Sequence, residues 1–376
     1  MQLPRPTVDP GGLLEFSVVF TDRSLNHMSQ RFVRVMRDII DVLRTTYSAD
    51  TVAVVPGGGS YAMEAVARQL ATGQRCLIVR NGLFSYRWTQ IIEAGSITDD
   101  VSVCMARPET DQPQSPWRPA PVEEVVAAIR DQRSQVVFAP HVETASGVVL
   151  SDDYVRSLAD ATHEVGGIFV LDCVASGARW VDMTQLGVDV LISAPQKGWS
   201  GSPCAGYVML SEAGRSAVEA TTSTSFSVDL RKWLSVTEAY TEGRTPYHTT
   251  MPTDALAHNA AVMLETRDTG LEVLRAAQLE LGGRVRALLA EHGYPSVAAP
   301  DVASSSVVVV YTDDPDERSG DRFKEVGLQV AGGVPLMCGE PDGFSTFRIG
   351  LFGLDKLTDV DGTVARLREA LARLSR

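Results

Sequence analysis

The chain has 376 residues, of which 44% are hydrophobic and 22% are charged, and its formal net charge is −13. This length predicts two unequal domains, and the composition is typical of a globular protein without a disordered tract. The negative charge, without a cluster of basic and aromatic residues, argues against a nucleic-acid partner. The first residues lack the apolar core of a signal peptide, and no apolar run reaches the roughly 18 residues of a membrane span. We therefore expect a cytoplasmic protein with no membrane partner.

Five cysteines and six histidines are scattered along the chain without the close spacings that metal sites use. This distribution predicts buried free thiols and no bound metal.

Between residues 50 and 210, apolar strand-like runs alternate with segments that carry apolar residues at helical spacing. Seven strands are expected, at residues 51–55, 76–79, 101–104, 136–139, 168–171, 188–192 and 207–210. Helices are expected at residues 61–70, 122–130 and 154–165, which are long enough to be right-handed crossovers. The alternation predicts an α/β fold with a mostly parallel sheet flanked by helices.

Residues 230–291 are typical of helices, interrupted at Thr245-Pro246 and Met251-Pro252 because a residue before proline avoids the α region. Strands near residues 306–311 and 347–350, with helices near 322–326 and 357–374, predict a smaller C-terminal α+β domain. We expect an N-terminal segment at 1–20, a large domain at 21–255, and a linking helix with the small domain at 256–376.

A glycine-rich turn, Gly57-Gly58-Gly59-Ser60, lies between an expected strand and an expected helix. Glycines allow close approach of the backbone, and the N–H groups and dipole at a helix start favour an anion such as phosphate. Ser60 could cap the helix or bind that phosphate. The turn lacks the GxGxxG and GxxxxGK[ST] patterns, so it does not predict a dinucleotide or ATP.

Asp172 and Lys197 each follow an apolar run, where buried parallel strands should end and where ligands of such sheets bind. An amine that forms a Schiff base, with a carboxylate that keeps a pyridine nitrogen protonated, is what pyridoxal phosphate chemistry requires. A surface lysine and a helix-capping aspartate are the alternative interpretation.

The glycine turn, residues 141–147 (His-Val-Glu-Thr-Ala-Ser-Gly), Asp172, Gln196-Lys197 and Phe347-Arg348-Ile349-Gly350 follow one another along the chain. In this order the chain resembles the class V aminotransferases of fold type I, and within them the alanine–glyoxylate and serine–pyruvate group. The resemblance extends from about residue 10 to the end. It implies pyridoxal 5′-phosphate as cofactor and transfer of an amino group from alanine or serine to glyoxylate or pyruvate.

The resemblance also implies roles for individual residues. Lys197 would hold the cofactor through a Schiff base and move the proton, while Asp172 would pair with the pyridine nitrogen. Arg348 would bind the substrate carboxylate, with a structural salt bridge as the alternative. The remaining cofactor contacts would come from Gly58, Gly59, Ser60, Phe84, Thr144, Gln196, Tyr247 and Thr250.

The resemblance gives Phe84 and the pair of Tyr247 and Thr250 more specific roles. Phe84 would stack on the cofactor ring, although core packing is an equally ordinary use of an aromatic residue. Tyr247 and Thr250 would reach the phosphate of a neighbouring subunit, which predicts a homodimer with a shared site. A polar turn before a helix that starts with proline is the alternative for that segment.

Other functions remain open from the sequence. The residues after the lysine, Gly198 to Cys204, differ from the stretch expected for the mammalian-type enzymes, which leaves the substrate preference open. Transamination of 2-aminoethylphosphonate is one alternative, and it would need extra cationic groups. A cysteine desulfurase is a weaker alternative, with Cys338 in a flexible-looking loop as its nucleophile, while Cys173 beside Asp172 is expected to pack. A protein that only binds the cofactor has no need for Lys197, Asp172 and Arg348 together.

Overall fold

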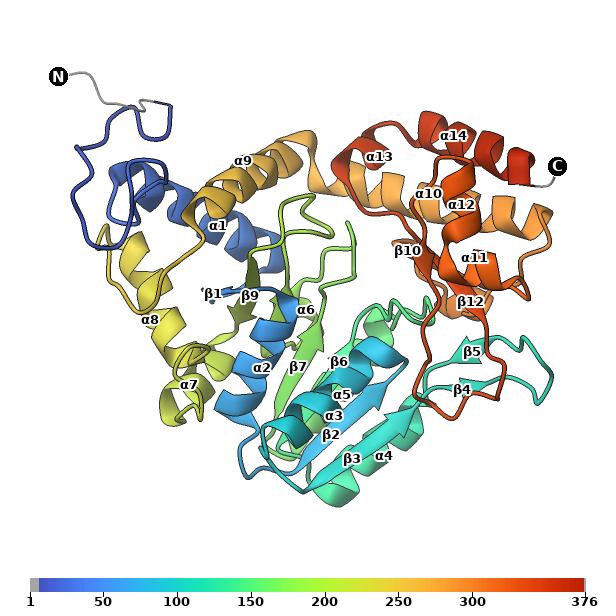
Figure 1. Ribbon diagram of the computed structural model, residues 1–376. Coiled ribbons are helices and arrows are strands. Elements are labelled where there is room, and N and C mark those ends of the chain that lie inside the picture. Colours follow the sequence, from blue (N-terminus) through green and yellow to red (C-terminus); the bar gives the residue numbers. More distant parts are fainter. Residues whose placement is uncertain (1–6, 375–376) are drawn as a thin grey trace.

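The computed structural model describes residues 7–374 and contains a central sheet with strand order β1-β9-β8-β7-β6-β2-β3 (Figure 1). The strands are Thr51–Pro56 (β1), Cys76–Arg80 (β2), Val101–Met105 (β3), Val136–Pro140 (β6), Ile168–Asp172 (β7), Val190–Ser193 (β8) and Ala205–Leu210 (β9). Strand β9 is antiparallel to both of its neighbours, and the other adjacent pairs are parallel. The seven predicted strands and the mostly parallel sheet are confirmed, because fully apolar runs of this length are stable only where both faces of a strand are buried.

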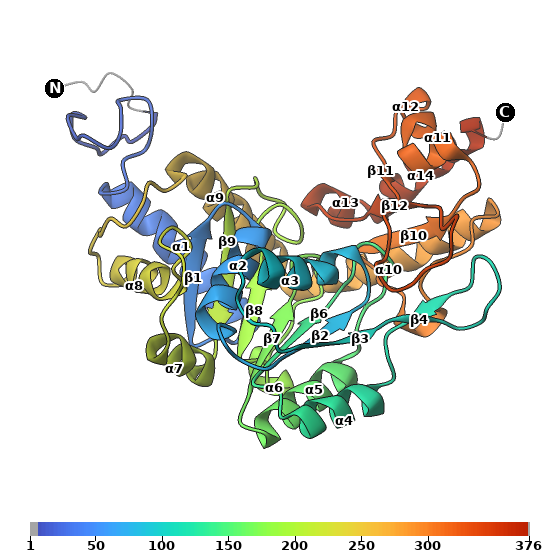
Figure 2. The ribbon, with the colours of Figure 1, turned by 60° about the horizontal axis from the view of Figure 1, so that its bottom comes forward.

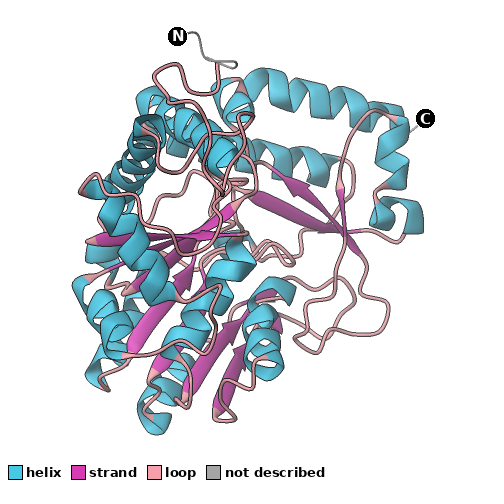
Figure 3. Ribbon diagram, turned by 60° about the vertical axis from the view of Figure 1, so that its left-hand side comes forward, coloured by secondary structure: helices cyan, strands magenta, loops and turns pink. Residues whose placement is uncertain are grey.

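Helices cover both faces of this sheet (Figure 3). They are Gln30–Tyr47 (α1), Gly59–Leu70 (α2), Leu83–Ala94 (α3), Val122–Gln132 (α4), Asp152–Glu164 (α5), Met183–Leu186 (α6), Glu212–Ala220 (α7) and Leu230–Thr241 (α8). The three predicted crossover helices correspond to α2, α4 and α5. Helix α1 was not predicted, although it buries residues at helical spacing, including Phe32, Met36, Ile39 and Leu43.

The predicted interruption after α8 is present, and helix α9 (Thr253–Thr269) begins directly after Pro252. A second interruption was not predicted. Gly270 has φ +102° and separates α9 from α10 (Leu271–Glu291), a backbone conformation that glycine adopts without steric cost. The region from residue 230 to residue 291 is therefore three helices.

The C-terminal part contains an antiparallel sheet with order β10-β12-β11. Its elements are a 3₁₀ turn at Pro300–Val302, strands Val307–Tyr311 (β10), Ala331–Gly332 (β11) and Thr346–Gly350 (β12), and helices Pro315–Ser319 (α11), Asp321–Glu325 (α12), Leu354–Thr358 (α13) and Val360–Leu374 (α14). The closing helix predicted at 357–374 is present as α14, but it begins at Val360, and the three residues before it do not belong to the same helix. Asp359 leaves the helical conformation, and its carboxylate accepts the N–H of Gly362, so it starts α14 as a new helix.

The buried apolar side chains form two main clusters. The larger surrounds the seven-stranded sheet and includes Leu256 and Met263 of α9, whereas the second includes Leu274 and Leu281 of α10. The domain limits near residues 20 and 255 stay a prediction. The C-terminal sheet lies to one side of the central sheet, beside a short hairpin of β4 (Arg107–Pro108) and β5 (Trp117–Arg118) (Figure 2).

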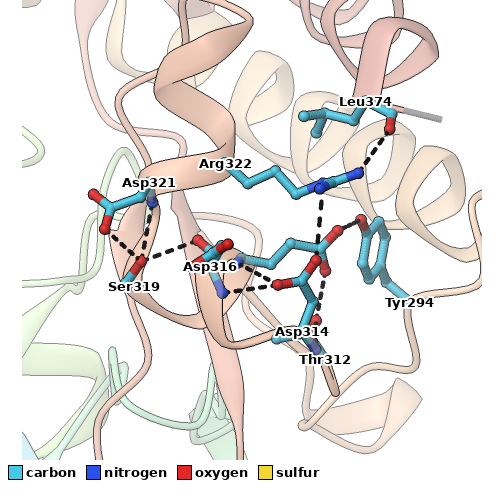
Figure 4. Close-up of polar contacts among 9 residues, drawn as sticks. Tyr294, Thr312, Asp314, Asp316, Ser319, Asp321, Arg322 and Leu374 are labelled. Atoms are coloured by element: carbon cyan, nitrogen blue, oxygen red, sulfur yellow. Dashed lines mark hydrogen bonds and ion pairs between the residues drawn. The ribbon is translucent and has the colours of Figure 1, made fainter. Parts of the chain in front are cut away.

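A polar network holds the C-terminal elements together (Figure 4). The carboxylate of Glu317 accepts hydrogen bonds from the hydroxyls of Tyr294 and Thr312, and Arg322 donates to the carbonyl of Leu374 at the end of α14. These contacts satisfy the buried carboxylate of Glu317 in α11 and tie α12 to the last helix. No helix within residues 7–374 combines the length and apolar character that a membrane crossing requires.

Candidate active site

The predicted site residues follow the carboxyl ends of five strands of the central sheet. The glycine turn follows β1, Phe84 follows β2, Thr144 follows β6, Asp172 ends β7 and Lys197 follows β8. These five strands run in the same direction, so their carboxyl ends lie along one edge of the sheet, where ligands of such sheets bind. Arg348 lies on β12 of the other sheet, and charge interactions link it to Lys197.

Lys197 is half-buried in the turn between β8 and β9, and its Nζ lies 4.9 Å from the centre of the Phe352 ring. Burial lowers the pKa of this amine, and the positive charges of Arg348 and Arg87 lower it further, while Asp172 acts in the opposite direction. A lowered pKa increases the fraction of neutral amine. The environment therefore makes Lys197 a better nucleophile than an exposed lysine.

Asp172 has an oxygen, Oδ1, that accepts the N–H of Val174 at 2.9 Å. Burial raises the pKa of its carboxyl group to about 6, and the charge of Glu143 adds to this, whereas the Val174 hydrogen bond, Arg87 and Lys197 oppose it. A half-buried carboxylate in this situation gains from a cationic partner. A protonated ring nitrogen would be such a partner.

The glycine turn leaves open space at the start of α2. Gly57 has φ +124°, Gly58 is the N-cap of α2 without any side-chain capping bond, and a Cβ atom on Gly58 would meet nothing within 4 Å. Gly59, by contrast, has no room for a side chain, because a Cβ atom there would lie 2.9 Å from the side chain of Val174. Ser60 is the second residue of α2, so it does not cap the helix. The open side of this turn fits an anion that accepts hydrogen bonds from backbone N–H groups.

Arg87 of α3 lies beside this turn, and the sequence analysis missed it. Its Nη1 donates to the Oγ of Ser60 at 2.9 Å, and its Cζ lies 5.2 Å from the centre of the Phe84 ring. The spacing of Phe84 and Arg87 is i, i+3, which places both on one face of a helix. Recognising α3 in the sequence would therefore have brought Arg87 to the site.

Arg348 of β12 lies next to Phe84 of α3. The Cζ of Arg348 lies 5.6 Å from the Phe84 ring centre, and its Nε donates to the carbonyl of Gly332 at 2.9 Å. Arg348 makes no ion pair with any residue between 7 and 374, so the structural salt bridge considered as an alternative is absent from this part of the chain. Its guanidinium retains donors for a carboxylate.

Glu143, which the sequence analysis did not single out, joins two segments of the site. Its completely buried carboxylate accepts from the N–H groups of Phe84, Ser85 and Ala145 and from the hydroxyl of Ser85. Two of these donors are the N–H groups at the start of α3, which favours a negative charge there. Glu143 thus sets the position of Phe84 relative to the loop that carries Thr144.

Two other predicted residues lie on the same edge. Thr144 is buried and follows Glu143 directly. The Oε1 atom of Gln196 is buried and has no hydrogen-bond partner within residues 7–374. This oxygen is an acceptor and needs a donor, so only the NH₂ end of the Gln196 amide could serve a phosphate at the open glycine turn.

Tyr247 and Thr250 hydrogen-bond to one another at 3.1 Å, and both are exposed. The side chain of Tyr247 is 55% exposed. The structure therefore leaves this pair available to a second molecule, and their predicted contact with a neighbouring cofactor stays a prediction.

Cys173 and Cys338 both have thiols that their surroundings keep protonated. Burial raises the pKa of the Cys173 thiol, and burial with the charges of Glu143 and Glu340 raises the pKa of Cys338 to about 12. The loop of Cys338 is not loose, since Glu340 accepts the N–H groups of Leu336, Met337 and Cys338. Residues 7–374 bring together no group of three or more side chains of the types that hold a metal.

Comparisons with known proteins give relatives along nearly the whole chain. A small subunit of soluble hydrogenase from Synechococcus sp. is 24% identical, with 100% of this chain and 93% of that protein covered. A 2-aminoethylphosphonate–pyruvate transaminase from Burkholderia thailandensis is 28% identical, with 89% and 87% covered. An alanine–glyoxylate aminotransferase from Oryctolagus cuniculus is 26% identical, with 98% and 90% covered.

Solved structures show the same fold. An aspartate aminotransferase of subgroup IV from Thermus thermophilus superposes with a TM-score of 0.76 at 25% identity, with 93% of each chain covered. An alanine–glyoxylate aminotransferase from Nostoc sp. gives a TM-score of 0.76 at 21% identity, with 93% of this chain and 89% of that chain covered. Both support the predicted fold of type I aminotransferases.

The family model of the class-V aminotransferases matches residues 15–317. This match covers the glycine turn, the loop of Glu143 and Thr144, Asp172 and Lys197 in one alignment. The chain therefore belongs to the class-V aminotransferases, whose cofactor is pyridoxal 5′-phosphate.

Proposed function

We propose that the protein is an aminotransferase that takes the amino group of a small amino acid, alanine or serine, and gives it to a small 2-oxo acid, glyoxylate or pyruvate. The two half-reactions would alternate in a ping-pong sequence. The observation that carries the proposal is the position of Asp172 at the end of β7 and of the half-buried Lys197 just after β8, since these two strands are adjacent and parallel, with the charge of Arg348 acting on the Lys197 amine. These three groups are the base, the partner of the ring nitrogen and the substrate clamp that transamination needs.

When bound, the cofactor supplies a protonated pyridine ring that accepts the electron pair left on the substrate's α carbon. Asp172, held by the Val174 N–H, keeps its negative charge towards that ring nitrogen. Lys197 would hold the cofactor, and its amine, when free, would act as the base that removes the proton from the substrate's Cα and returns it. Arg348 holds the substrate carboxylate, with its orientation set by the hydrogen bond from its Nε to Gly332.

We further propose that Gly58, Gly59, Ser60 and Gln196 bind the cofactor phosphate, that Thr144 contacts the ring and that Phe84 stacks on it. Glu143 supports this role of Phe84 because it fixes the first turn of α3. The exposed pair of Tyr247 and Thr250 would complete the site of a second subunit, so the active unit would be a homodimer.

Transamination of 2-aminoethylphosphonate is a second candidate because of Arg87, which supplies a cation near Lys197 and Asp172. A phosphonate dianion requires such a group. A relative with this activity, 28% identical, supports keeping the candidate. A desulfurase is disfavoured, since the raised pKa of Cys338 keeps its thiol protonated and unreactive.

The test is the visible spectrum of the purified protein with pyridoxal phosphate, before and after separate additions of L-alanine, L-serine, 2-aminoethylphosphonate and L-cysteine. We expect alanine or serine to convert the cofactor's visible band to the absorbance of its amino form, with release of the matching 2-oxo acid. Conversion by 2-aminoethylphosphonate alone would favour the second candidate. If no amino donor changed the spectrum, the aminotransferase proposal would be contradicted.

A further inference from the structure

Ser60 has an unused proton. Its Oγ accepts a hydrogen bond from Nη1 of Arg87 at 2.9 Å, and within residues 7–374 the hydroxyl donates to no acceptor. A hydroxyl has one donor and two acceptor positions, so the bond from Arg87 leaves the O–H proton free to point elsewhere. Ser60 lies in the first turn of α2, a helix of 12 residues whose N-cap has no side-chain hydrogen bond. The free O–H and the free backbone N–H groups thus lie at the same helix end.

Arg87 also has unused donors. It is half-buried, makes no ion pair within the described part of the chain, and uses one N–H for Ser60. Its charge acts on both Asp172 and Lys197, lowering the pKa of each group. A guanidinium held between Ser60 and the Phe84 ring is oriented without being neutralised.

Among the charges of the proposed site, the cofactor phosphate has not yet been given a cationic partner. Asp172 would face the ring nitrogen, Glu143 is satisfied by four hydrogen bonds, and Arg348 would face the substrate carboxylate. A phosphate group at the glycine turn carries nearly two negative charges, and backbone N–H groups alone supply only partial positive charge. Arg87 is the guanidinium that contacts this turn.

We propose that Arg87 is a binding residue for the cofactor phosphate, acting directly through its free N–H groups and also through Ser60, whose O–H it turns towards the phosphate. This inference rests on the proposed phosphate role of the glycine turn. It adds a positively charged side chain to a phosphate site that otherwise consists of backbone N–H groups, a hydroxyl and an amide. It also competes with the second candidate function, because an arginine engaged by the cofactor phosphate is not free to bind a distal anionic group on the amino donor.

The test compares the affinities of the cofactor-free protein for pyridoxal phosphate and for pyridoxal, which lacks the phosphate. In Arg87→Gln we expect about 10- to 100-fold weaker binding of pyridoxal phosphate and unchanged binding of pyridoxal. Arg87→Lys should recover part of the loss because it keeps the charge without the planar fork. Inorganic phosphate should compete with pyridoxal phosphate less strongly in the Gln variant than in the natural protein.

Arg130→Gln is the matched control, since Arg130 is exposed on α4 and pairs with Glu164. Equal loss of pyridoxal and pyridoxal phosphate affinity in Arg87→Gln would overturn the inference, because the role would then be structural. It would also be overturned if pyridoxal phosphate bound normally while the half-reactions of L-aspartate or 2-aminoethylphosphonate were selectively lost. Failure of every amino donor with the natural protein would contradict the proposed function but leave the phosphate result valid.

Discussion

The amine of Lys197 lies 4.9 Å from the centre of the Phe352 ring, so a side chain that follows β12 contacts an amine carried by the central sheet. The ring covers one side of the half-buried amine, whose pKa burial lowers. This contact joins the two parts of the chain at the amine that we propose holds the cofactor.

Lys197 is one of four lysines in the chain, with Lys232, Lys324 and Lys356, which makes the attachment site easy to map. We expect borohydride reduction of the protein loaded with pyridoxal phosphate to label the peptide of Lys197 alone. Lys197→Ala should abolish both the label and transamination, whereas Lys232→Ala, on the exposed face of α8, should change neither. Substantial transamination by the Lys197 variant would refute the assignment.

Arg348→Ala should raise the Michaelis constants for both the amino acid and the 2-oxo acid. The lost interaction is a charge-assisted pair with the carboxylate that both substrates share, so we expect an increase of about 10- to 100-fold. Steady-state kinetics with each substrate varied in turn measures this effect. Unchanged Michaelis constants would remove Arg348 from the substrate site.

The pH dependence of cofactor attachment should respond to Arg348 as well. The positive charge of Arg348 disfavours the protonated form of Lys197, so removing it must raise the pKa of the amine. Attachment requires the neutral amine, and the pH midpoint for attachment of pyridoxal should therefore move upward in Arg348→Gln. Arg156→Gln, an exposed residue of α5, should leave the midpoint in place. A downward shift in Arg348→Gln would contradict the proposed charge coupling.

Glu143→Gln should destabilise the protein. Each carboxylate oxygen accepts from two donors, so an NH₂ group in place of either oxygen would face donors in a completely buried position. We expect a loss of about 1–3 kcal/mol in the free energy of unfolding. Chemical denaturation measures this loss, and Glu93→Gln, at an exposed position on helix α3, serves as the control with little change.

A shared site predicts complementation between subunits. In a mixed dimer of Lys197→Ala and Tyr247→Ala chains, one site would carry both defects and the other would carry neither. Random mixing of equal amounts should then recover about a quarter of the natural activity. No recovery in verified mixed dimers would show that Tyr247 acts within its own subunit or not at all.

The seven strands of the central sheet could be predicted because a strand buried on both faces must be apolar along its length. The same local signal located Asp172 and Lys197, since each lies where such a run ends. The glycine turn could also be predicted from the local sequence, because its backbone requires glycine: Gly57 adopts a positive φ and Gly59 has no room for a side chain. Short-range sequence patterns carry these features because each depends on local backbone conformation and burial.

Other features depend on which distant segments meet. The hydrogen bond from Arg87 to Ser60 spans 27 residues, that from Phe84 to Glu143 spans 59, and Phe352 reaches Lys197 from beyond β12. A sequence shows where a charge lies along the chain, but its partner is decided by the packing of helix α3, the loop after β6 and the C-terminal sheet. The sequence by itself thus determined the strands of the sheet and the positions of Asp172 and Lys197 at their carboxyl ends, whereas only the tertiary structure decided which charges surround them.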